Sequence, residues 1–103
     1  MKLIQKLCEM VDEEIGDAHK YAKCALECKD DNPNLAKVFF DLSVAEMQHM
    51  TILHNEVTKQ IEKYRQEKGE PPDGMKALYD YLHQKQIDKA AEVKTLQGMY
   101  RGA

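Results

Sequence analysis

Helix-breaking residues gather in only two places in this chain of 103 residues. The first is the segment 30–33, Asp-Asp-Asn-Pro, in which Asn32 suits the N-cap of a helix and Pro33 its first residue. The second is the turn 69–74, Gly-Glu-Pro-Pro-Asp-Gly, where Asp73 is another capping candidate. No segment alternates with the two-residue period of a strand. The sequence therefore predicts one all-α domain with helices over about 3–30, 33–68 and 74–100.

The composition excludes several classes of protein. The net charge is −3, so no basic surface points to a nucleic-acid partner. No apolar run approaches the roughly 20 residues that span a membrane, and the N-terminus lacks the apolar stretch of a signal peptide. Cys8, Cys24 and Cys28 are odd in number, which argues against a closed disulfide framework and indicates small buried thiols. We expect a cytoplasmic protein with neither a nucleic-acid nor a membrane partner.

A glutamate lies at the centre of the apolar face of the second predicted helix. At about 100° per residue, a set of apolar side chains falls within about 60° of Glu46. They are Leu35, Phe39, Leu42, Met50, Leu53, Val57, Ile61 and Tyr64. Burying a bare carboxylate there would cost many kcal/mol. His49 follows one turn later and can bind the same group as Glu46. A metal ion is the bound group that best explains this pair.

The first predicted helix repeats this pattern around Glu14. Its apolar stripe consists of Leu3, Leu7, Met10, Val11, Ala18, Tyr21, Ala25 and Cys28. The short link makes the first two helices antiparallel neighbours. Glu14 lies about 18 residues before Asn32 and Glu46 about 14 after it, so the two carboxylates should lie at a similar level.

The third predicted helix looks like a brace or an interface element and a poor donor of metal ligands. Its apolar band comprises Met75, Leu78, Leu82, Val93, Leu96 and Tyr100, and Gln86 interrupts it. Asp80 and His83 have the spacing of a ligand pair but point about 90° or more away from this band, and Glu92 lies at its opposite edge. Lys89 lies within the band, which leaves open a metal-free alternative in which it forms a buried ion pair with one glutamate.

Three further residues carry weaker expectations. His19 falls on the outer side of its helix and is expected to be solvated. His54 lies at the edge of the apolar stripe. It either supports a metal ligand or is a histidine at the boundary of the core whose polar atoms have other hydrogen-bond partners. Gly16 lies within the first helix and faces away from the stripe, which suggests that another helix packs closely there.

The combination of Glu14, Tyr21 seven residues later and the Glu46-x-x-His49 step resembles the ferritin-like superfamily, especially short encapsulated ferritins and rubrerythrin helical hairpins. The resemblance covers residues 1 to about 66. It implies an antiparallel hairpin plus a third helix, with a ferritin-like four-helix core completed by dimerisation. Glu14, Glu46 and His49 from two chains would then bind two iron ions at the dimer interface. These ligands also suit manganese or zinc.

The function that this resemblance implies is oxidation of ferrous iron with dioxygen or peroxide, in iron handling or oxidative defence. Glu46 would bridge the ions, with Glu14 and His49 as terminal ligands in a homodimer or higher homo-oligomer. Tyr21 is a candidate catalytic residue, although it also fits a core aromatic. Residues 96–103 do not resemble an encapsulation tail, which argues against loading into a protein shell. The alternative function is a metal-free structural or adaptor bundle, of the kind found in phages and mobile elements.

Overall fold

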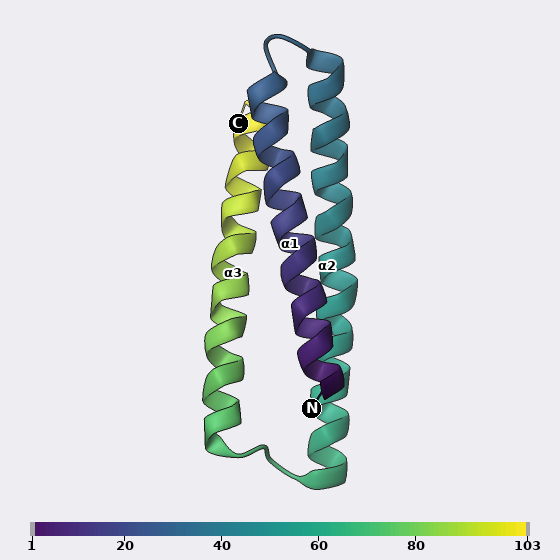
Figure 1. Cartoon of the computed structure of the whole chain (residues 1–103), viewed down its shortest axis with the longest axis vertical. Helices are drawn as coiled ribbons and strands as arrows, with labels where there is room; N and C mark the ends of the chain where they lie inside the picture. The colour runs from purple at the N-terminus through teal and green to yellow at the C-terminus, as the bar shows by residue number, and fades with distance from the viewer. Residues whose placement is uncertain (1, 103) are drawn as a thin grey trace.

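The computed structural model describes residues 2–102 as three long helices that run up, down and up (Figure 1). They are α1 (Lys2–Cys28), α2 (Pro33–Lys68) and α3 (Asp73–Arg101). The molecule is narrow, with extents of 55 × 19 × 18 Å. The described residues contain no strand, so the all-α prediction is confirmed. Within the same residues, no helix is both long enough and apolar enough to cross a membrane.

A side chain caps the helix that follows the first break in the sequence, but none caps the helix that follows the second. Asn32 caps α2, because its side chain accepts a hydrogen bond from the Leu35 N–H at 3.2 Å, and Pro33 opens the helix as predicted. Gly69 ends α2 with a φ of 79°, a conformation that favours glycine. Asp73 was predicted to cap α3, and this is wrong: the N-cap is Pro72, and no side chain caps the helix.

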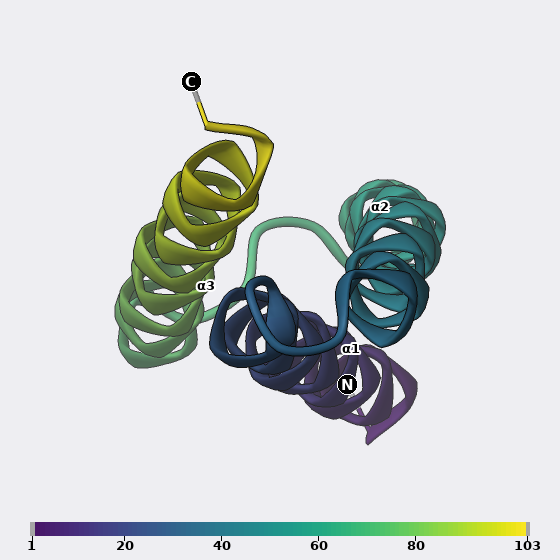
Figure 2. The same ribbon diagram turned by 90° about the horizontal axis from the view of Figure 1, so that it is seen from above.

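Helix α1 forms the centre of the molecule. Its backbone lies close to both other helices, whereas the backbones of α2 and α3 are farther apart and these two helices meet mainly through side chains (Figure 2). Its buried positions recur at alternating steps of three and four residues, apart from a gap at the half-buried Cys8. They are Ile4, Val11, Ile15, Ala18, Ala22 and Ala25. Val57 from α2 and Val93 from α3 complete the core around this line.

The buried face of α1 matches the predicted stripe only in part: Val11, Ala18 and Ala25 of the stripe are buried, and the rest of the buried face lies to one side of it. Ile15 and Ala22, both fully buried, lie about 80–100° around the helix from Glu14. The cause is α3, because α1 also packs against this helix and the contact buries side chains of α1 away from the Glu14 side. As a result, apolar side chains on the Glu14 side of α1 and the Glu46 side of α2 remain exposed. We call these four residues the open face: Leu3, Met10, Leu35 and Leu42.

Helix α3 attaches to the hairpin through buried amides. Gln97 Nε2 donates to Ser43 Oγ at 2.9 Å, and Ser43 Oγ in turn donates to the Ala18 carbonyl at 2.7 Å. Gln86 Nε2 donates to Asp12 Oδ1 at 2.9 Å. Gln86 was predicted to interrupt the apolar band, but it is buried in the contact with α1. Hydrogen bonds satisfy these polar groups, which would otherwise be costly to bury.

The same contact leaves part of the predicted band of α3 in solvent. Leu78 is 59% exposed and Leu82 is 39% exposed. The band therefore faces inward only in part, with Val93 fully buried and Leu96 and Tyr100 half-buried.

Gly16 lies on an exposed part of α1 that no other helix approaches closely. A Cβ atom built at this position meets nothing within 4 Å. The expectation of a close helix contact is therefore wrong, and nothing in the structure explains the glycine.

Candidate metal centre

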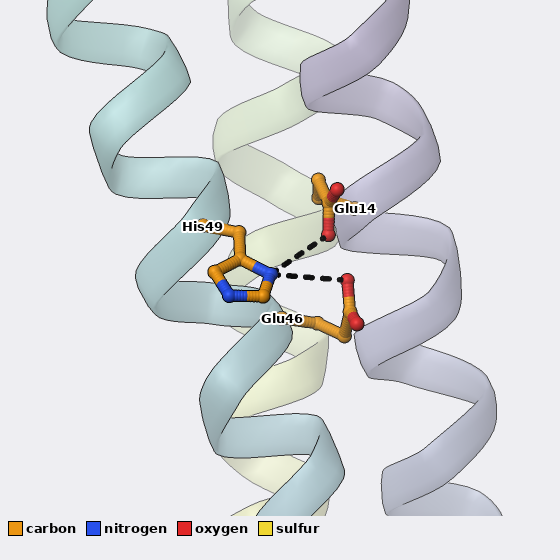
Figure 3. Close-up of side chains that lie close together, drawn as sticks. All are labelled: Glu14, Glu46 and His49. Carbon is orange, nitrogen blue, oxygen red and sulfur yellow. Dashed lines mark ion pairs between the residues drawn. The ribbon is translucent and has the colours of Figure 1, made fainter.

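The structure brings Glu14, Glu46 and His49 together between α1 and α2 (Figure 3). One potential ligand atom from each of the three side chains lies within 4.8 Å of the others. His49 Nδ1 is 3.6 Å from Glu14 Oε2 and 3.8 Å from Glu46 Oε2. The two antiparallel helices thus place the carboxylates at the same level, as the spacing around Asn32 predicts.

One oxygen atom in this group has no hydrogen-bond partner. Glu14 Oε2 is shielded from solvent, and nothing in the described part of the chain donates a hydrogen bond to it. The imidazole nitrogen at 3.6 Å is too far away for a good hydrogen bond. An unsatisfied buried acceptor costs about 1–3 kcal/mol, and more when it is charged. A bound cation would satisfy this oxygen, so the residues present fit a metal.

The donor set of one chain is incomplete. It offers two carboxylates and one imidazole, fewer ligands than the four or more that zinc and iron sites normally use. The side chains of Glu46 and Glu14 are 20% and 26% exposed, whereas that of His49 is 56% exposed. The group is therefore open to solvent on the His49 side, along α2 near the exposed Leu42.

The structure does not support the alternative in which Lys89 forms a buried ion pair with Glu14 or Glu46. This residue is exposed on α3, and within residues 2–102 it forms no ion pair with Glu14 or Glu46. Both glutamates pair with His49 instead. In the metal-free alternative, His49 is therefore the partner of the two carboxylates.

Tyr21 is half-buried on α1, seven residues beyond Glu14. Its ring stacks on Phe39 of α2 with centroids 6.3 Å apart. This contact agrees with a core aromatic, and a catalytic role for Tyr21 stays a prediction.

The other three histidines contribute to the contacts between α3 and the hairpin. His19, expected to be solvated, is half-buried, and its Nε2 lies 3.7 Å from Glu92 Oε2. His83, expected to point away from the core, stacks on His54 of α2 with ring centroids 5.0 Å apart. Burial, followed by the charge of His83, lowers the pKa of His54. Asp80 is exposed, so the Asp80–His83 spacing does not produce a second buried pair.

Comparisons with known proteins assign no family to this chain. No family model matches it, and neither a curated protein nor a solved structure gives a match. The function of the group formed by Glu14, Glu46 and His49 must therefore be inferred from its geometry and donor chemistry.

Proposed function

We propose that this protein is a di-metal carboxylate protein that oxidises ferrous iron. The observation that carries the proposal is the buried Glu14 Oε2, which has no hydrogen-bond donor and lies beside Glu46 and His49. Carboxylate oxygens suit hard iron ions, and an imidazole adds one nitrogen ligand. The spacing of Glu14, Tyr21, Glu46 and His49 that resembles the ferritin-like superfamily supports the same assignment.

We further propose that two copies of the chain complete the site. Di-iron bundles use two lone glutamates and two Glu-x-x-His pairs, and one hairpin supplies half of this set. A two-fold axis beside the group would bring in the same three residues from the second copy. The open face would then be covered by its own equivalent, which gives a reason for the exposure of Leu35 and Leu42.

The ligands have different roles in this proposal. Glu46 is the least exposed of the three and would bridge the ions, while Glu14 and His49 would each hold one. The negative carboxylates offset the charge of the bound ions. Two ferrous ions held by these residues would each supply one electron, and the two electrons with two protons would convert dioxygen to hydrogen peroxide. If hydrogen peroxide were the oxidant instead, two electrons from two ferrous ions and two protons would convert it to two water molecules.

A metal-free bundle is the competing function. His49 Nδ1, at 3.6 and 3.8 Å from the two carboxylates, would pair with both of them without a metal. In that case the hairpin would serve as a scaffold for partners.

Anaerobic titration with Fe²⁺ followed by oxygen distinguishes the two functions. The proposal predicts saturation near one ion per chain and a rise in near-ultraviolet absorbance when oxygen is added. The matched control is His83→Ala, which removes the histidine of the Asp80–His83 spacing and should leave both results unchanged. An absence of saturable binding, or binding without oxidation by either oxygen or peroxide, would contradict the proposal. Parallel titrations with Mn²⁺ and Zn²⁺ compare the affinity of the site for these metals with its affinity for Fe²⁺.

A further inference from the structure

A groove runs between the N-terminal halves of α1 and α3, about 120° around α1 from Glu14. Its volume is about 360 Å³, within the range of small-molecule sites. The apolar lining comes from Ile4 of α1 and from Met75, Leu78 and Leu82 of α3. Because Leu78 and Leu82 are both exposed, a ligand in the groove would remove apolar surface from water.

The charged residues that line this groove are all acidic. They are Glu9 and Asp12 of α1, and the lining contains no lysine, arginine or histidine. Gln86 Nε2 fixes one oxygen of Asp12 by donating a hydrogen bond to it at 2.9 Å. Glu9 is exposed and remains available to a ligand.

Two other lining groups of the groove, Cys8 and Tyr79, have raised pKa values. Burial, followed by the carboxylates of Asp12 and Glu9, raises the pKa of the Cys8 thiol. Burial is also the main cause that raises the pKa of Tyr79, with Cys8 and Asp80 contributing and the positive charge of Arg65 opposing them. Both groups therefore stay uncharged at neutral pH, and Glu9 and Asp12 are the charged residues of the lining itself.

We infer that this groove binds a small elongated molecule with an apolar chain and a cationic head, such as an alkylamine. The chain would lie against Leu78, Leu82 and Ile4, and the head would lie beside Glu9 and Asp12. The compact volume fits a small molecule better than a partner helix, which needs a long groove. The binding residues are separate from Glu14, Glu46 and His49, so this inference does not depend on the metal.

Binding can be measured by calorimetry with three probes that share a ten-carbon chain: decyltrimethylammonium, decanol and decanoate. The cation should bind saturably at one per chain, with a Kd about tenfold lower than that of the anion and below that of the alcohol. Glu9→Gln should weaken binding of the cation about threefold. Glu13→Gln removes a neighbouring carboxylate that does not line the groove, and should change the Kd little.

Alkylation of the thiols locates the bound probe. Occupancy should slow the reaction of Cys8 with iodoacetamide several-fold, whereas Cys24 and Cys28, which lie outside the groove, serve as internal controls. Equal affinity for all three probes, or binding without protection of Cys8, would overturn the inference. Tighter binding and protection by a basic amphipathic peptide would overturn the assignment to a small molecule.

Discussion

Replacing Glu46 with alanine is expected to abolish stoichiometric metal binding, with a loss of affinity of at least about 100-fold. Loss of a residue that only supports a metal ligand typically costs 10–100-fold, and a bridging carboxylate should cost more. Each dimer would lose two carboxylates at once, because the symmetry repeats every substitution. Anaerobic equilibrium dialysis against Fe²⁺, followed by elemental analysis, measures the effect directly.

Two companion variants make this result specific. Glu46→Gln keeps the shape of the side chain and removes its charge, so it should lose most of the affinity while the helix content stays unchanged. Glu56→Ala removes another glutamate from α2, one that pairs with Lys59 away from the site, and should bind metal normally. Equal metal content in the parent and Glu46→Ala would show that the group does not bind the ion.

Leu35→Asp is expected to convert the proposed dimer into a monomer. In the proposed dimer, the open face would place Leu35 against the second copy, and because its side chain is 40% exposed in the single chain, aspartate there should cost little core packing. In the dimer the new carboxylate would be buried or would face its own copy, which costs several kcal/mol. The dissociation constant of the dimer should rise by more than about 100-fold. Light scattering during gel filtration reports the mass.

Ile87→Asp is the matched control for this substitution. Ile87 is 49% exposed and lies on α3, away from the open face, so the same change there should leave the dimer intact. Leu35→Asp should also lower metal content, because the half-site of a monomer lacks the partner's ligands. A dimer that survives Leu35→Asp but not Ile87→Asp would place the interface on α3 instead.

The helical periodicity and the breaks were sufficient to predict three helices whose ends lie within two residues of those observed. They also predicted the meeting of Glu14 with Glu46 and His49. This was possible because an α-helix has a fixed rise per residue and a short link forces neighbouring helices to run antiparallel. The distance along each helix from the turn therefore determines which residues lie at the same level.

The direction of the buried faces could not be predicted in the same way. A helical wheel assigns one apolar face to each helix, but α1 has two neighbours and buries the sector that both of them share. Gln86 and Gln97 were missed because an amide is suited to the core only when a partner accepts or donates at the right place. The stack of His54 on His83 depends on the same packing of α3, which neither helix reveals alone.

Native mass spectrometry of the protein loaded anaerobically with Fe²⁺ tests most directly whether two chains share the metal. It reports the number of chains and the number of bound ions in the same particle. The predicted result is a dimer that carries two ions and loses both of them when Glu46 is replaced by alanine. A monomer that retains its ion, or a dimer that never binds one, would contradict the shared di-metal site.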